Sequence, residues 1–314
     1  MTSIRRSVLG IALALFAAAA LAQAYPARPI RVVVPYPPGG GTDVLARLVG
    51  RYMTESFAQP IVVENRAGAN AKIGMEVVAK SAPDGYTLMA IAAGPLNEEN
   101  MKLFAPIALM AAPSYLLVVH PSVKANSVKE LIALARAQTG KIAYGSTGGG
   151  AASHLATELF RVMAGIELLH VPYKGVGQAV GDLLGGQVQM MIAPAQVAVP
   201  HVKSGRLRAL AVSGAKRLST LPDLPTIAEA GLPGYESVGW FGLMVPAGTP
   251  AEIVSRLNRE VNRILMLPDV RERLLELGAD PASTTSVQFG EFIRRENTKW
   301  AKFIQEQGIV VEGQ

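Results

Sequence analysis

The chain has 314 residues, of which 50% are hydrophobic and 17% are charged, and it contains no cysteine. Without cysteine there can be no disulfide bond, no cysteine-ligated metal and no thiol nucleophile. The formal net charge of +6 is spread along the sequence without runs of Lys and Arg, so the composition gives no indication of nucleic-acid binding.

The N-terminal residues predict a secretory signal peptide. Two adjacent arginines precede an apolar run at residues 8–21, and the Ala-Gln-Ala sequence at 22–24 is typical of a cleavage site. The apolar run is shorter than the roughly 20 residues needed to span a bilayer, which argues against a membrane anchor. We therefore expect cleavage after Ala24 and a periplasmic mature chain comprising residues 25–314. The choice between Sec and Tat export stays open.

Strands and helices alternate along the rest of the chain, a pattern typical of an α/β fold with mostly parallel sheets. The segment 92–104 is polar and matches no regular element. In the first part of the chain we predict strands at 30–34, 60–64 and 86–91, helices beginning near residue 44 and at 73–80, and one or two apolar strands within 108–119.

A second unit begins with a predicted helix at 128–138. Ser127 suits its N-terminal cap, because the hydroxyl can accept a hydrogen bond from a first-turn N–H group. The unit continues with predicted strands at 141–144, 168–173, 188–192 and 207–213, a helix ending near residue 164, and helices at 176–184 and 194–203. The apolar face of the helix that ends near 164 is predicted to comprise Leu155, Leu159, Val162 and Met163.

The last part of the chain is predicted to return to the first domain. It comprises a strand at 240–245, a helix at 250–267 capped by Thr249, and helices at 269–277 and 286–307. The chain would then cross between two α/β domains twice, near 120–123 and near 238–242. We therefore expect one lobe made of residues 25–121 and 240–314 and a second lobe made of residues 122–239.

Two glycine-rich loops each follow a predicted strand and precede a predicted helix. The first glycine loop, residues 35–43, reads Pro-Tyr-Pro-Pro-Gly-Gly-Gly-Thr-Asp, and the second glycine loop, residues 145–150, reads Gly-Ser-Thr-Gly-Gly-Gly. Free backbone N–H groups at a helix start bind carboxylate or phosphate oxygens. Each loop could instead be a tight turn that binds nothing, but two matching loops favour a ligand held between them.

Nucleotide-binding motifs do not match either loop. Neither contains the lysine of a P-loop, and the second glycine loop spaces its glycines as G-x-x-G-x-G rather than as the dinucleotide-binding G-x-G-x-x-G. We therefore expect no cofactor.

Candidate catalytic residues form no recognisable set. Ser146 lacks the G-x-S-x-G turn of a nucleophilic serine, and Asp43 suits a first helical turn, where the helix dipole stabilises it. His154 is expected to make a hydrogen bond within its loop. The remaining histidines show no metal-ligand spacing and are interpreted as structural; they are His120, His170 and His201. We expect no metal site, and the chain is not predicted to be an enzyme.

Several motifs together match one family of receptors. The matching stretches are 25–30, 34–43, 64–70, 82–88, 144–156, 170–175, 205–212, 224–234 and 247–250. On these residues the chain, over essentially its whole mature length, resembles the extracytoplasmic solute receptors of tripartite tricarboxylate transporters, known as Bug receptors. The resemblance implies a two-lobed periplasmic-binding-protein fold (Venus flytrap, type II), with two doubly wound mixed sheets and a hinge crossed twice.

The resemblance also implies a ligand and a partner. A small organic carboxylate would be held between the two glycine loops, partly through water, and delivered to membrane transporter subunits. A sensor kinase is the alternative partner for the same fold. We expect a monomer that binds no nucleic acid. The implied ligand-binding residues are Tyr36, Gly39, Gly40, Thr42, Asp43, Gly145, Ser146, Thr147, Gly148, Gly150, His154 and Ala193.

Three departures from the family pattern affect the predicted site. The loop at 93–100 is about ten residues shorter than in relatives, and Ala151 stands where relatives have a Ser or Thr that caps the following helix. Ala193 stands where relatives often have an aspartate, which could pair with a ligand ammonium group. The sequence therefore predicts a carboxylate ligand without an α-amino group.

Overall fold

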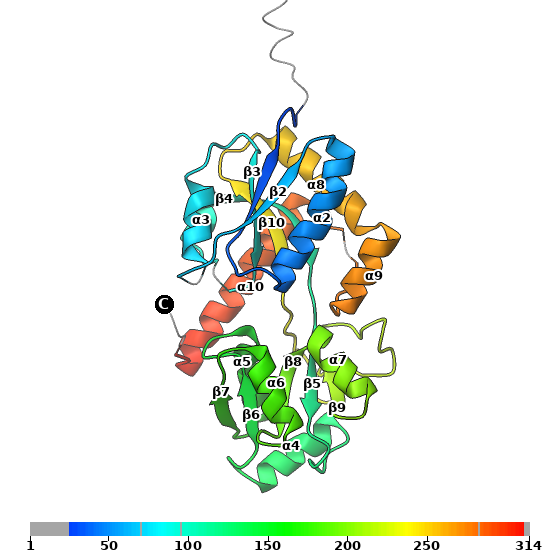
Figure 1. Cartoon of the computed structure of the whole chain (residues 1–314). Helices are drawn as coiled ribbons and strands as arrows, with labels where there is room; N and C mark the ends of the chain where they lie inside the picture. Colours follow the sequence, from blue (N-terminus) through cyan, green and yellow to red (C-terminus); the bar gives the residue numbers. More distant parts are fainter. Residues whose placement is uncertain (1–24, 70, 95, 282, 311–314) are drawn as a thin grey trace, which may run out of the picture.

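The computed structural model describes residues 25–69, 71–94, 96–281 and 283–310 (Figure 1). The predicted signal peptide, residues 1–24, lies outside the described residues. The described chain forms two α/β lobes, one above the other in Figure 1, and each is built on a five-stranded mixed sheet. The predicted two-lobed α/β fold is confirmed.

The upper lobe contains a sheet with the strand order β2-β1-β3-β10-β4. Its strands are β1 (Ile30–Val34), β2 (Ile61–Asn65), β3 (Thr87–Ala92), β4 (Phe104–Ala111) and β10 (Phe241–Pro246). The first three run parallel, while β10 runs antiparallel to both of its neighbours. The near-continuous apolar run of β1 is typical of a strand buried on both faces. The predicted return of the chain to the first sheet through β10 is confirmed.

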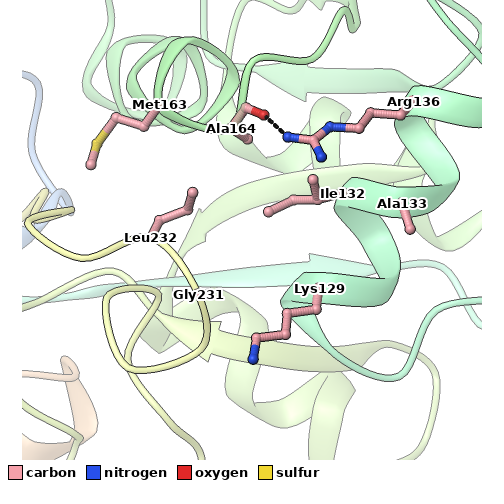
Figure 2. Close-up of a pocket in the computed structure, with 8 residues that line it drawn as sticks. All are labelled: Lys129, Ile132, Ala133, Arg136, Met163, Ala164, Gly231 and Leu232. Carbon is pink, nitrogen blue, oxygen red and sulfur yellow. Dashed lines mark hydrogen bonds between the residues drawn. The ribbon is translucent and has the colours of Figure 1, made fainter.

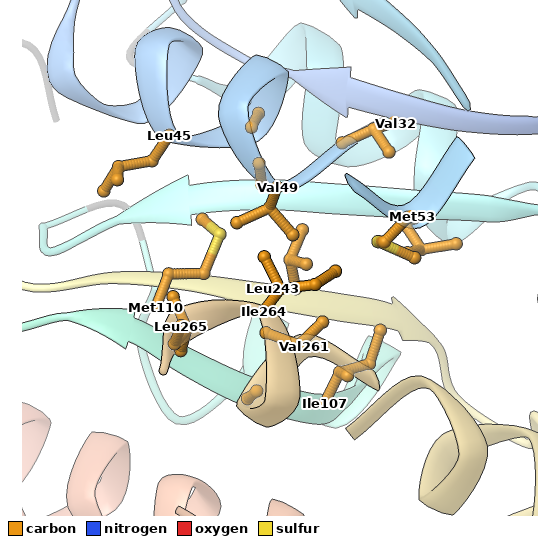
Figure 3. Close-up of a cluster of buried hydrophobic side chains, with 14 of the residues drawn as sticks. Val32, Leu45, Val49, Met53, Ile107, Met110, Leu243, Val261, Ile264 and Leu265 are labelled. Carbon is orange, nitrogen blue, oxygen red and sulfur yellow. The ribbon is translucent and has the colours of Figure 1, made fainter. Parts of the chain in front are cut away.

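Helices cover both faces of this sheet. They are α2 (Gly41–Phe57), α3 (Lys72–Ala79), α8 (Ala251–Leu265), α9 (Pro268–Glu276) and α10 (Ser286–Gln307), with a 3₁₀ turn at Asn100–Leu103. Leu45, Val49 and Met53 follow a spacing of four residues, which places them on one face of α2. Figure 3 shows this face packed toward α8 over the sheet, and all three side chains are buried in the main core cluster. Burying each such side chain contributes roughly 2 kcal/mol.

Helix α8 begins one residue later than predicted, and Thr249 does not cap it. The cap residue is Pro250, which offers no side-chain acceptor. The Thr249 hydroxyl instead donates a hydrogen bond of 2.8 Å to the carbonyl oxygen of Pro246. The threonine is therefore used to close the turn that precedes the helix.

The lower lobe contains a sheet with the strand order β7-β6-β8-β5-β9. Its strands are β5 (Tyr115–Val119), β6 (Ala143–Ser146), β7 (Leu169–Pro172), β8 (Met190–Pro194) and β9 (Arg208–Val212). Its helices are α4 (Val128–Ala137), α5 (Ala152–Ala164), α6 (Val176–Leu184) and α7 (Ala195–Lys203). The predicted cap of α4 is confirmed, since the Ser127 hydroxyl accepts a bond from the N–H of Glu130.

The buried face of α5 differs from the predicted one. Val162 and Met163 are each 36% exposed, whereas Phe160 is fully buried. The core stripe follows Ala156, Phe160 and Ala164 at a spacing of four residues. Polar side chains in the first two turns are buried as well, because they bond to the second glycine loop and to β6. Leu155 is buried and Leu159 packs against the core, so the predicted face is confirmed at these two residues and wrong at Val162 and Met163.

The first crossing between the lobes also differs from the predicted position. Strand β5 pairs with β8 and β9 in the second sheet, so the chain crosses at 112–114 and not at 120–123. Pro113 lies in this crossing segment, between β4 and β5. The return crossing lies beside it: Ser114 and Val238 form an antiparallel bridge, and the N–H of Gly239 donates to the carbonyl of Pro113 at 2.9 Å.

Candidate functional site

The strand directions place both glycine loops on the facing sides of the lobes. In the first sheet, β4 ends and β10 begins at the crossing segments. Because β3 is antiparallel to β10 and β1 is parallel to β3, the carboxyl end of β1 lies at the same edge. Figure 1 shows the start of α2 at the end of the upper lobe nearest the lower lobe.

The second sheet repeats the arrangement. Strand β5 begins at the crossing, β8 is antiparallel to β5, and β6 is parallel to β8, so the carboxyl end of β6 faces the upper lobe. Strands β1 and β6 each lie between their two parallel neighbours, where the chain direction across the sheet reverses. Ligands of open α/β sheets bind at such switch points, and both glycine loops lie there.

The first glycine loop leads into a helix start that no side chain caps. Gly40 is the cap residue of α2, and it makes no side-chain cap bond. The first-turn N–H groups of a helix have no partner within the helix, so they remain able to bind an anion. Gly39 has a φ of +87°, a conformation that favours glycine. Thr42 lies in the same first turn and is 4% exposed.

The carboxylate of Asp43 links the first glycine loop to α2 and β2 through hydrogen bonds. The carboxylate accepts bonds from the Gly39 N–H at 2.9 Å, from Arg47 Nε at 3.0 Å and from Asn65 Nδ2 at 3.0 Å. Burial alone would raise the pKa of Asp43, but these donors outweigh it and hold the pKa below its ordinary value. The side chain is an anion whose two oxygens are both bonded to the protein.

Tyr36 fixes the loop to the neighbouring strand. Its hydroxyl oxygen accepts a bond of 3.2 Å from the N–H of Ala92 at the end of β3, and burial raises its pKa above the ordinary value. Asn65 adds a bond of 3.1 Å to the Tyr36 carbonyl. The loop is therefore held at three strand ends, those of β1, β2 and β3.

The second glycine loop begins inside the sheet. Gly145 and Ser146 are the last residues of β6, rather than loop residues as predicted. The N–H and the hydroxyl of Thr147 both contact Ser153 Oγ, at 3.0 and 3.1 Å. Gly148 and Gly150 have positive φ angles of 118° and 76°. The loop thus turns sharply over the start of α5.

Helix α5 also begins without a side-chain cap. Its cap residue is Ala151, in an extended conformation and without a cap bond, which agrees with the predicted loss of a capping hydroxyl. His154 Nδ1 accepts the N–H of Gly150 at 2.9 Å, so the predicted hydrogen bond of His154 within its loop is confirmed.

A stack of three rings lies under the second glycine loop. The ring centroids of Tyr144 and His170 are 4.9 Å apart, those of His154 and His170 are 4.2 Å apart, and the interplanar angles are 17° and 16°. His170 Nε2 is 2.7 Å from Ser146 Oγ. His170 therefore contacts the loop's supporting residues, a role that sequence reasoning missed. No local signal in the sequence could have found this contact, because it depends on the pairing of Tyr144 with His170 in the register of β6 against β7.

Tyr144, at one end of the stack, is held by a hydrogen bond to the charged side chain of Glu158. The Tyr144 hydroxyl donates to Glu158 Oε1 at 2.6 Å, and Arg161 Nε donates to Glu158 Oε2 at 2.9 Å. Burial, and then the bond to Glu158, raise the pKa of Tyr144 above its ordinary value. The phenol stays neutral across the physiological pH range.

Ala193 lies apart from the hydrogen bonds of both loops. It is a fully buried residue of β8, paired with Leu116 of β5, and its methyl group belongs to the apolar cluster that includes Ala195. The structure therefore places this predicted site residue in the core of the lower lobe.

Two hollows in the described surface lie away from the loops. The larger, about 410 Å³, is on the lower lobe and is shown in Figure 2; it is lined by Lys129, Ile132, Ala133, Arg136, Met163, Ala164, Gly231 and Leu232. Arg136 there donates a bond of 2.8 Å to the Ala164 carbonyl and so completes the end of α5. The smaller, about 190 Å³, adjoins the crossing segments at Ser114 and Val238. Neither is lined by a residue of the glycine loops.

The described part of the chain lacks two further features. It contains no cluster of three or more His, Cys, Asp or Glu side chains that could hold a metal ion. It also contains no helix with the length and apolar character needed to cross a membrane.

Comparison with known proteins shows the family. Residues 45–309 match the model of TctC, described as the tripartite tricarboxylate transporter family receptor. Protein BugT of Bordetella pertussis is 39% identical over 315 residues, covering 96% of this chain and 97% of BugT.

Solved structures agree in fold. Rpa4515 of R. palustris with adipate is 36% identical with a TM-score of 0.78, covering 91% of this chain and 99% of that one. MatC of Rhodopseudomonas palustris with bound malate is 32% identical with a TM-score of 0.72, covering 88% and 98%. The family is one of solute-binding receptors and not of enzymes, as predicted. The chain belongs to the tripartite tricarboxylate transporter receptor family.

Proposed function

We propose that this protein is a periplasmic receptor that captures a small carboxylate between its lobes and delivers it to a tripartite tricarboxylate-type transporter. The observation that carries the proposal is the pair of helix starts without side-chain caps, α2 and α5, at the switch points of two facing sheets. Such starts present N–H groups and a positive dipole end to an anion. The similar receptors with adipate and malate support a carboxylate as that anion.

The roles of the predicted site residues divide in two. We assign direct ligand contact to the backbone of Gly40 and Thr42 at the start of α2 and to the backbone of Gly148 in the second glycine loop. Asp43, Tyr36 and His154 position the loops, because their polar atoms are bonded to loop backbone or to neighbouring strands. Closure of the lobes about the paired crossing segments would enclose the carboxylate.

The ligand is proposed to lack an α-amino group. Ala193 offers only a buried methyl group, and Asp43 is already bonded to three protein donors. An ammonium group buried without an anionic partner would be strongly unfavourable.

A thermal-shift screen of di- and tricarboxylates tests the function. A ligand at 100 times its Kd stabilises the folded state by about 2.7 kcal/mol, so a rise in Tm is expected with adipate, malate or a related acid. The matched pair of malate and aspartate tests the amino-group prediction: malate is expected to raise Tm more. No shift with any carboxylate would contradict the receptor function, and a shift only with amino acids would contradict the ligand class.

The partner and the export signal are tested separately. We expect uptake of the identified carboxylate to be lost when the gene for this protein is deleted; a loss of transcriptional response with uptake intact would favour the sensor-kinase partner. Mass spectrometry of the exported protein is expected to show a mature chain beginning at Tyr25. Light scattering is expected to give the mass of a monomer.

A further inference from the structure

The stack of rings beneath the second glycine loop contains two histidines in direct contact. His170 comes from β7 and His154 from the first turn of α5, and their ring centroids are 4.2 Å apart. Tyr144 of β6 stacks on His170 from its own strand. Histidine is the side chain whose charge changes near neutral pH, so the charge of this stack can respond to what binds above it.

The two histidines differ in what a proton would do to their bonds. His154 Nδ1 accepts the Gly150 N–H, and an accepting nitrogen cannot carry a proton without losing that bond. His170 Nε2 contacts a serine hydroxyl at 2.7 Å, and a hydroxyl can either donate or accept. Ser146 Oγ also has the Gly148 carbonyl at 3.3 Å, so its hydrogen can turn to that carbonyl when His170 becomes a donor.

The surroundings of His170 also allow one positive charge. The face of Tyr144 stabilises a cation above it. Glu158, which holds the Tyr144 hydroxyl, is neutralised by Arg161. On the other side of β6, Tyr173 lies against Gly145 and donates to Asp182 at 2.7 Å. A second charge on His154 is disfavoured by like-charge repulsion at this distance.

We propose that His170 is a positioning residue that takes up one proton from solvent when the second glycine loop binds a carboxylate, while His154 stays neutral and holds Gly150. This rests on the proposed function. A carboxylate at the loop favours the imidazolium beneath it, and the imidazolium strengthens the loop's attraction for the anion, because the two events are linked. Affinity therefore rises as the pH falls, by at most about tenfold per pH unit for one proton.

Calorimetry tests the proton uptake with adipate and malate as probes. Binding is measured at pH 7 in two buffers of different ionisation enthalpy, and the difference gives the number of protons taken up. We expect a value above zero and at most about one, with binding at least about fivefold tighter at pH 6 than at pH 8. Binding that is equally tight at both pH values and that takes up no proton would overturn the proposal.

Three variants locate the proton. His170→Gln is expected to abolish proton uptake while retaining weaker binding. His154→Gln is expected to weaken binding but keep the uptake, because His170 remains. His201→Gln on α7 is the matched control, with uptake and affinity unchanged. Proton uptake that persists in His170→Gln would overturn the proposal.

Imidazole NMR keeps the proposal testable if a variant fails to fold. In the wild-type protein, adding adipate or malate at pH 7 is expected to shift the His170 ring toward the protonated form and to leave His154 neutral. A His170 ring that stays neutral in the bound protein would overturn the proposal while leaving the receptor function intact. If no carboxylate binds at any pH, the receptor function fails and this proposal fails with it.

Discussion

The two glycine loops share one backbone plan but are supported by different chemistry. Under the first loop, the Asp43 carboxylate is fixed by Arg47 and Asn65. The second loop is supported instead by the stacked rings of Tyr144, His170 and His154 and by a hydrogen bond to Ser153. A similar strand–glycine–helix plan therefore does not imply the same support: the first loop rests on a carboxylate whose pKa is held below its ordinary value, whereas the second rests on stacked rings that include two histidines.

Removing the Asp43 carboxylate, which supports the first loop, is expected to change the free energy of unfolding most. Asp43→Ala leaves Arg47, Asn65 and the Gly39 N–H without their acceptor, which is expected to lower the free energy of unfolding by about 3 kcal/mol. Glu76→Ala is the control, because its ion pair with Lys80 is exposed and is expected to matter by about 0.5 kcal/mol or less. Urea denaturation measures both, and equal effects would contradict the assigned role of Asp43.

At acid pH, the contribution of Asp43 to the free energy of unfolding is expected to decrease. The pKa of Asp43 is lowered in the folded state, so its contribution is fully present above the ordinary aspartate pKa of about 4 and is lost as the pH falls through the folded value. The stability difference between wild type and Asp43→Asn should be constant from pH 8 to about 5 and should narrow below about pH 4. A difference that grows on acidification would show that the pKa is raised instead.

Removing the hydrogen bond between Tyr144 and Glu158, which holds the ring stack, is expected to lower the stability of the protein. Tyr144→Phe removes the bond to Glu158 but leaves Glu158 paired with Arg161. We expect a loss of about 1.5 kcal/mol, measured by denaturation at pH 8, with the histidine stack retained. A loss as large as that of Asp43→Ala would mean that the two supports are equivalent, contrary to the comparison.

The smallest expected effect is an increase in the stability of the protein. Ala151→Ser adds a side-chain cap to α5, where the backbone is already extended and no cap bond exists, and should stabilise the protein by about 0.5 to 1 kcal/mol. Ala152→Ser, one residue inside the helix, is the control and should give no gain. The new hydroxyl would compete for the first-turn N–H groups, so a weaker affinity for adipate or malate is expected alongside the higher Tm. Higher stability with unchanged affinity would show that these N–H groups do not contact the ligand.

Much of the fold could be predicted because its signals are local. The helix at 286–307 was predicted with its observed bounds, and Ser127 was predicted as a cap, since periodicity and capping depend on neighbours within one or two turns. The crossing at 112–114 was missed because an apolar run does not reveal where one strand ends and the next begins in another sheet. Pro113 lies at that boundary, but Pro106 lies within β4, so a proline alone does not mark where the strand ends.

For the candidate site, the two glycine loops, their places before helix starts and the missing hydroxyl at Ala151 could be predicted from the sequence. The support of each loop depends on tertiary contacts. Asn65 reaches Asp43 from another strand, and His170 meets His154 and Ser146 through the register of β7 against β6. These contacts join residues 16 to 24 positions apart. They depend on sheet order and strand register, which no local pattern of residues specifies.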